Sequence, residues 1–140
     1  MSQVLEKGGR PELRRRLLAR AAVMTAFLLA TLPPRRIRAV LRLVRWRAKP
    51  TTYDQALAAR SDVVAVNARC AGSYCLQRSL ATTLLCRARG TWPAWIVGVR
   101  TPPFAAHAWV EVDGHPVGEP VESSTYRAIL AVRPMTRRGR

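Results

Sequence analysis

The chain has 140 residues, of which 49% are hydrophobic, so it is long enough for one domain with a buried core and too short for several. It carries 24 Lys and Arg against 8 Asp and Glu, a formal net charge of +16. Residues 1–50 hold 13 basic and 2 acidic side chains, whereas residues 51–132 hold 7 and 6. We therefore predict a basic helical region over 1–50, a nearly neutral core over 51–132 and a basic flexible tail over 133–140.

The first of two basic helices is expected to start at Glu12, after Pro11, and to end where two prolines, Pro33 and Pro34, stop it. Its apolar part, residues 21–32, is shorter than the about 20 residues of a membrane span, and no signal-peptide cleavage site follows it. We favour a buried core helix, and an interfacial helix on anionic lipid and a true span stay open. The protein is thus expected in the cytoplasm, in the interfacial case peripheral to the inner face of the membrane.

The second basic helix runs from Arg35 until Pro50 stops it. Arginine-rich helices can bind nucleic acid through its phosphates. The aromatic residues do not interleave with this charge and no nucleic-acid motif accompanies it, so a solvated arginine-rich face is the better interpretation. We expect no specific nucleic-acid partner, and a basic nucleic-acid or membrane-surface protein is kept as an alternative function.

A cysteine stands at the start of an amphipathic helix in the middle of the chain. Leucine spacing predicts this helix over 74–89, with Ser73 as N-cap and Gly90 after its end, so that Cys75 lies near the second helical position. A thiolate attacks carbonyl carbon, and the free N–H groups and dipole of a first helical turn favour negative charge. Cys75 is therefore a candidate nucleophile, and a buried inert thiol is the alternative.

An antiparallel sheet is expected after the cysteine helix. The expected strands cover residues 95–100, 106–112, 116–121 and 128–132. A turn at Asp113 and Gly114 joins the second and third strands, and His107 lies on the second. A further helix is expected before the cysteine helix, with Thr52 as its N-cap and helical spacing over residues 56–70. This order predicts an α+β fold in which the cysteine helix and N-terminal helices pack on a small antiparallel sheet.

Three cysteines, Cys70, Cys75 and Cys86, indicate reduced thiols and no disulfide framework. Cys75 and Cys86 would lie about 16 Å apart on one helix, too far for a disulfide. The spacing from Cys70 to Cys75 does not match a zinc knuckle, and His115 lies beside a turn, so neither a metal site nor a cofactor is expected.

Two segments around the cysteine and the histidine resemble a known family. They are Cys75-Leu76-Gln77-Arg78-Ser79-Leu80 and Ala106-His107-Ala108-Trp109-Val110-Glu111-Val112-Asp113-Gly114. They are similar to the transglutaminase-like cysteine proteases of lasso-peptide biosynthesis, the B2-type leader peptidases, and the resemblance covers about residues 60–122. It implies a papain- or transglutaminase-like fold and a triad of Cys75 as nucleophile, His107 as general base and Glu119 as the acid that orients the base. The family usually has Asp in the third role.

The resemblance also implies removal of the leader from a ribosomally made precursor, after which an asparagine-synthetase-like lasso cyclase uses the freed amino terminus. Fused members carry a leader-binding winged-helix domain before the protease, but residues 1–50 read as helices. The expected partners are therefore the precursor leader peptide, a separate leader-recognition protein of the B1 type and the cyclase. A non-catalytic papain-like scaffold is the alternative, and the intact Cys75 and His107 count against it.

Glu119 reaches His107 only in one register of the hairpin between them. A two-residue loop would place Glu119 opposite Ala108, with its side chain pointing away from His107. One extra loop residue, with Gly114 in the left-handed region, would pair Trp109 with Glu119 and bring the acid to the His107 face. We therefore predict a bulged hairpin.

Overall fold

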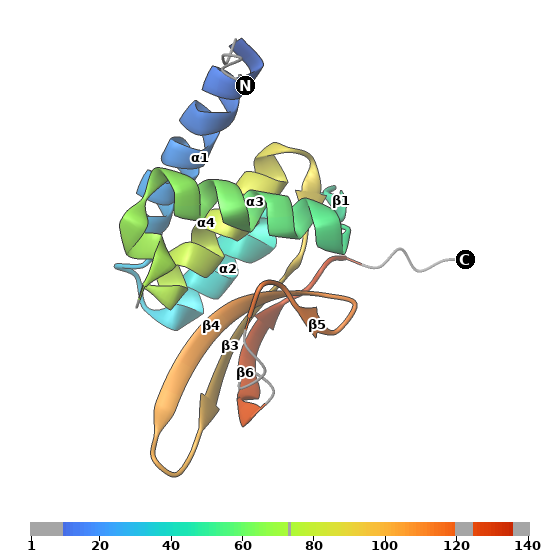
Figure 1. The fold of residues 1–140 in the computed structure, drawn as a ribbon. Helices are drawn as coiled ribbons and strands as arrows, with labels where there is room; N and C mark the ends of the chain where they lie inside the picture. The colour runs from blue at the N-terminus through green and yellow to red at the C-terminus, as the bar shows by residue number, and fades with distance from the viewer. Residues whose placement is uncertain (1–9, 73, 120–124, 136–140) are drawn as a thin grey trace, which may run out of the picture.

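A computed structural model describes residues 10–72, 74–119 and 125–135. Their elements are α1 (Arg10–Leu29), α2 (Pro34–Val44), β1 (Lys49–Pro50), α3 (Tyr53–Val66), the 3₁₀ helix η1 (Ala68–Ala71), α4 (Cys75–Ala88), β2 (Thr91–Trp92), β3 (Ala94–Arg100), β4 (Ala105–Val112), β5 (His115–Pro116) and β6 (Arg127–Val132). The fold has the predicted α+β class. Figure 1 shows the helices gathered on one side of the molecule and the long β3–β4 hairpin extending away from them.

The first two helices are present, but their ends differ from the prediction. α1 begins at Arg10, so that Pro11 lies in its first turn, and α2 ends at Val44, before Pro50. α2 begins at Pro34, the first helical position, where the missing N–H costs nothing. The fully buried residues of α1 are small, and four of its five leucines are exposed. The favoured prediction of a core helix therefore holds for one face of α1 only. Within the described ranges, no helix is both long and apolar enough to cross a membrane.

The third helix starts as the sequence predicted and ends earlier. Thr52 accepts a hydrogen bond from the backbone N–H of Gln55 at 3.2 Å, and the Gln55 side chain accepts one from the Thr52 N–H at 3.0 Å, a capping box. The predicted continuation of this helix to Cys70 is wrong. Asn67 is extended, and its side chain accepts a hydrogen bond from the N–H of Arg69 at 2.9 Å, which starts the short 3₁₀ turn η1 instead.

The main sheet has the strand order β5-β4-β3-β6, and its pairs are antiparallel. A second pair, β1 with β2, is parallel and joins the end of the α2 region to the residues after α4. The helix-facing side of the sheet contributes Trp95, Val110 and Val132 to the same buried cluster as Leu80 and Leu85 of α4. The helix that begins with Cys75 is therefore fixed against the sheet by the main core.

The hairpin between β4 and β5 does not have the predicted bulge. Val112 pairs directly with His115 across a two-residue turn. Asp113 and Gly114 both have left-handed backbones, with φ of 52° and 81°, as two-residue hairpins require, and Asp is among the residues that tolerate this conformation. The returning strand was predicted over residues 116–121, but β5 ends at Pro116. The last two residues of that prediction, 120–121, lie outside the described residues.

Candidate active site

Cys75 is the first residue of α4. The N-cap is Tyr74, which makes no side-chain capping bond, and the predicted cap Ser73 lies outside the described residues. The first backbone hydrogen bond of the helix runs from the Arg78 N–H to the Tyr74 carbonyl, at 2.9 Å. The N–H of Cys75 thus belongs to the groups that a helix start leaves without an intrahelical acceptor. Such a group can hold a developing negative charge.

Two contacts hold the start of α4 in place. The indole Nε1 of Trp95 on β3 donates a buried hydrogen bond to Ser79 Oγ, at 3.1 Å. The ring of Phe27, near the end of α1, lies 5.7 Å from the ring of Tyr74, centroid to centroid. The residues on either side of Cys75 are therefore bound to the sheet and to α1, which limits the movement of the thiol.

The structure brings His107 and Glu119 into direct contact. The Nε2 atom of His107 lies 2.7 Å from Oε1 of Glu119, and the side chains are 18% and 3% exposed. The imidazole ring also stacks on Trp109, with centroids 5.6 Å apart, and contacts Tyr126 at 5.4 Å. A carboxylate on Nε2 orients the ring and leaves Nδ1 as the nitrogen that can take a proton from a thiol.

Glu119 reaches His107 by a route that the sequence analysis did not foresee. The β4–β5 ladder ends with a bond from the Val117 N–H to the Val110 carbonyl, at 2.8 Å. Gly118 then has φ of +65°, which breaks the alternation of the strand. The change of direction that was predicted in the loop therefore occurs at Gly118, and it turns Glu119 toward His107.

Two arginines that the sequence analysis missed surround the same carboxylate. Arg60 of α3 lies 3.5 Å from Oε2 of Glu119, and Arg78 of α4 lies 3.8 Å from it. Burial, followed by the charge of Arg78, lowers the pKa of the Arg60 guanidinium, and Glu119 acts in the opposite direction. Two guanidiniums against one carboxylate give this cluster a positive excess. The only sequence sign of it was an arginine three residues after Cys75, on a helix that otherwise packs against the core.

Arg78 connects the acid to the cysteine. Its Nη1 donates to the carbonyls of Cys70 and Gly72, at 3.0 and 3.1 Å, and so fixes the chain that leads into α4. Residues three apart on a helix are neighbours, about 5–6 Å between Cβ atoms. Cys75 thus lies one turn from a side chain that borders Glu119, although its sulfur makes no hydrogen bond to any described residue. Contacts between a nucleophile and its base are commonly loose until substrate binds.

The other two cysteines and the two acidic residues near His107 in the sequence have different surroundings from Cys75 and Glu119. Cys70 and Cys86 are buried, and burial raises the pKa of both thiols, that of Cys86 to about 11. Glu111 accepts a hydrogen bond from the indole of Trp109 at 2.8 Å, and Asp113 is exposed in the hairpin turn. Within the described residues, no three His, Cys, Asp or Glu side chains are grouped so that they could hold a metal ion.

The chain matches the model of one protein family. The matching residues are 19–131, which include α2 and α3 as well as α4 and the strands of the main sheet. Neither the curated proteins nor the solved structures give a match to this chain. A match over this much of the chain, on an α+β fold with a cysteine at a helix start and a histidine on a strand, identifies the protein as a member of the transglutaminase-like superfamily.

Proposed function

We propose that this protein is a cysteine endopeptidase that removes the leader from a ribosomally made lasso-peptide precursor. The observation that carries the proposal is the 2.7 Å contact between His107 and Glu119, beside the helix that begins with Cys75. An oriented imidazole, a thiol and a helix-start N–H are the groups that acyl transfer needs. The resemblance of the segments around Cys75 and His107 to the leader peptidases supplies the substrate class.

The proposed reaction has two stages. Nδ1 of His107 takes the thiol proton as the sulfur of Cys75 attacks the scissile carbonyl, and the imidazolium that forms is stabilised by Glu119 through Nε2. His107 then gives the proton to the leaving amine, which departs as the amino terminus of the core peptide. Water, deprotonated by His107, attacks the thioester and releases the leader carboxylate and the free thiol.

The N–H of Cys75 would hold the oxyanion during both attacks. It is at the first position of α4, where the helix has no acceptor for it and where the helix dipole favours negative charge. Arg78 supports this geometry indirectly, since its hydrogen bonds to the Cys70 and Gly72 carbonyls fix the backbone before the helix. We assign Arg78 a positioning role.

Cleavage of the precursor by single-cysteine variants tests the proposal. Cys75→Ala is expected to abolish cleavage with little effect on the fold, because its side chain is only partly buried at the helix start. Cys70→Ala and Cys86→Ala are expected to retain activity. If Cys75→Ala retains cleavage and Cys86→Ala loses it, the assignment of Cys75 as the nucleophile is wrong.

A separate leader-recognition protein is part of the proposal. Alone, the protein is expected to cleave precursor slowly, and the recognition protein to raise the rate by presenting the leader at high effective concentration. The measurement is kcat/KM on full-length precursor with and without that protein. A leaderless peptide that spans the cleavage site is the control, because its rate is not expected to change. Full activity on precursor without a second protein would contradict this division of labour.

A further inference from the structure

The outer face of α1 carries a row of large apolar side chains that solvent reaches. Leu13, Leu17, Met24 and Leu28 are 58%, 55%, 69% and 72% exposed. At about 100° per residue, these positions fall within about 60° of one another and extend over about 22 Å. We call these four residues the α1 stripe. Single exposed apolar residues are ordinary, whereas several on one side of a helix indicate a surface that binds a partner or a membrane.

The opposite face of α1 shows that core packing does not explain the stripe. The residues that α1 buries are small, namely Ala19, Ala22, Val23 and Ala26. They pack in the main core together with residues of α4 such as Leu80. An ordinary amphipathic helix buries its largest apolar residues. Here the fully buried positions hold small residues, and Phe27 and Leu29 pack only partly buried against the core. The four large residues of the stripe face outward, so the described core does not cover them.

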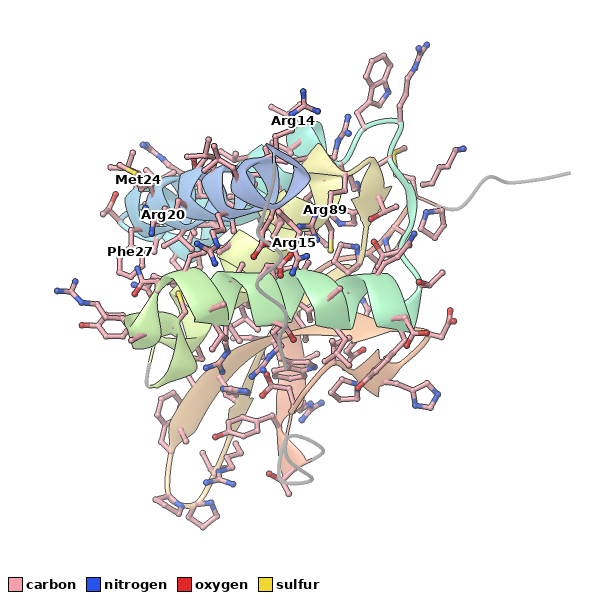
Figure 2. All side chains as sticks on the ribbon, turned by 45° about the horizontal axis from the view of Figure 1, so that its top comes forward. Arg14, Arg15, Arg20, Met24, Phe27 and Arg89 are labelled. Atoms are coloured by element: carbon pink, nitrogen blue, oxygen red, sulfur yellow. The ribbon has the colours of Figure 1, made fainter. Side chains whose placement is uncertain are left out.

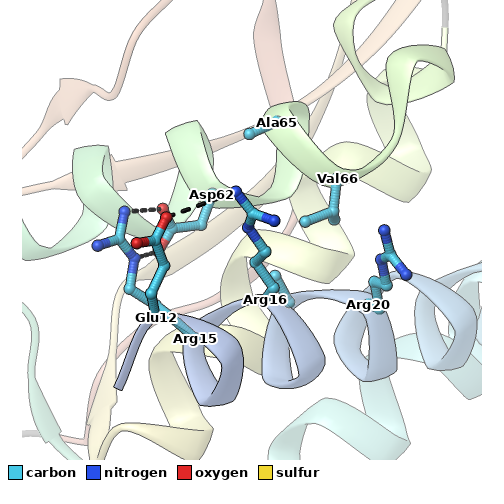
Figure 3. Close-up of a pocket in the computed structure, with 8 residues that line it drawn as sticks. Glu12, Arg15, Arg16, Arg20, Asp62, Ala65 and Val66 are labelled. Atoms are coloured by element: carbon cyan, nitrogen blue, oxygen red, sulfur yellow. Dashed lines mark hydrogen bonds and ion pairs between the residues drawn. The ribbon is translucent and has the colours of Figure 1, made fainter. Parts of the chain in front are cut away.

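Arginines border the stripe on both sides. Arg14 lies on one edge by helical position, and Figure 2 shows Arg14 and Met24 on the outer side of α1. Arg16 and Arg20 lie on the other edge, where they line a groove of about 470 Å³ between α1 and α3, seen in Figure 3. Glu12 is the single acidic residue in the described helices α1 and α2. The surroundings of the stripe are therefore strongly positive, which favours an anionic partner.

We propose that the α1 stripe docks the protein on the surface of an anionic lipid bilayer. The leucine and methionine side chains would enter the boundary of the acyl chains, while the bordering arginines bind headgroup phosphates. This is a binding property, and it does not depend on the proposed peptidase activity.

Two observations favour lipid over an acidic protein as the partner. Five of the eight residues that line the groove beside the stripe are charged, and among them Arg15 is already bound to Asp62 at 3.0 Å. The groove therefore offers little apolar surface to a partner's side chains. The positive charge is also spread beyond the stripe, over the arginines of α2, which are Arg35, Arg36, Arg38 and Arg42. A broad field of this kind matches an extended negative plane better than a small set of carboxylates.

Flotation of the full-length protein with vesicles tests the proposal. Vesicles of phosphatidylglycerol and phosphatidylcholine in equal parts are expected to bind the protein, more weakly as salt is raised, and phosphatidylcholine alone is expected to bind it poorly. The double variant Leu17→Ser/Met24→Ser is expected to lower the partition coefficient at least about tenfold. A second pair, Leu13→Ser/Leu28→Ser, is expected to do the same.

The control is Ile129→Ser, which removes a comparably exposed apolar side chain, 57% accessible, from β6. It is expected to leave vesicle binding unchanged, and circular dichroism checks that each variant is folded. No binding of the unaltered protein to anionic vesicles, or equal binding by folded variants of both pairs, would overturn the proposal. If the pairs instead abolish binding to a purified acidic protein while vesicle binding persists, the stripe is a protein-docking site and the lipid assignment is wrong.

Discussion

Replacing Glu119 with Gln removes one charge from the candidate site and keeps the size of the side chain. The new amide oxygen can still accept the Nε2–H bond of His107, which is 2.7 Å long in the structure. What disappears is the negative charge that stabilises the imidazolium during attack by the thiol. We predict that Glu119→Gln lowers kcat/KM for precursor cleavage.

The size of the effect follows from the burial of the pair. The Glu119 side chain is 3% exposed, so water screens the lost charge little. A hydrogen bond to a charged group contributes about 1.5–3 kcal/mol and a neutral one about 0.5–1.5 kcal/mol. The difference of about 1–2 kcal/mol corresponds to a fall of about 5- to 30-fold in kcat/KM. The amide NH₂ would also face the guanidiniums of Arg60 and Arg78, donor against donor, which increases the loss.

Initial rates of precursor cleavage measure this effect, with thermal unfolding as the check on folding. Two matched controls remove a neighbouring carboxylate: Glu111, which is bonded to Trp109, and Asp113, which is exposed in the turn. Glu111→Gln and Asp113→Asn are expected to change kcat/KM less than about twofold, because neither acid contacts His107. A folded Glu119→Gln protein with unaltered kcat/KM would refute the role of Glu119.

Three further predictions concern the support of the site and the stability of the fold. Arg78→Gln is expected to lower kcat and to reduce the free energy of unfolding in urea by about 1–3 kcal/mol, because the buried bond to the Cys70 carbonyl and the part-buried bond to the Gly72 carbonyl are lost. Arg78→Lys is expected to restore only part of both, since lysine lacks the planar fork. At Gly118 the backbone has φ of +65°, and an added Cβ would lie 2.9 Å from Cδ of Arg60. Gly118→Ala is therefore expected to destabilise the protein by about 1 kcal/mol or more and to lower kcat/KM by displacing Glu119. Burial acts to raise the pKa of Asp62, but hydrogen bonds and charge from its two arginine partners outweigh it and leave that pKa below its ordinary value. The stability this gives is present above the unfolded-state pKa of about 4 and is lost as pH falls through the lower folded value, so acid unfolding of Asp62→Asn is expected to be less steep below about pH 4.

The parts of the fold that local pattern determines could be predicted from the sequence. The start of α2, expected at Arg35 and found at Pro34, and the cap of α3 by Thr52 depend on neighbouring residues alone. The position of Cys75 at a helix start was likewise predictable, one residue off, because leucine spacing marks α4. The outward leucines of α1 were not, since their orientation follows from which residues fit against α4.

The route from the strand to the acid could not be predicted, because it depends on contacts between distant segments. Asp113 accepts a left-handed backbone, so the hairpin closes with two residues and needs no bulge. Gly118 then turns the chain beside Arg60 of α3, more than fifty positions earlier in the sequence. The sequence analysis gave Arg78 no role of its own, and only the fold shows that it borders Glu119.

Covalent trapping of the thiol tests the central claim most directly. A peptide electrophile that spans the cleavage site is incubated with the protein at neutral pH, and the modified residue is identified by mass spectrometry. We predict a single adduct on Cys75, at a rate that falls at least about tenfold in His107→Ala, because a base must remove the thiol proton. Cys70 and Cys86 are expected to stay unmodified, since both are buried and burial raises their pKa values. An adduct on either buried thiol, or equal rates with and without His107, would contradict the proposed cysteine–histidine pair.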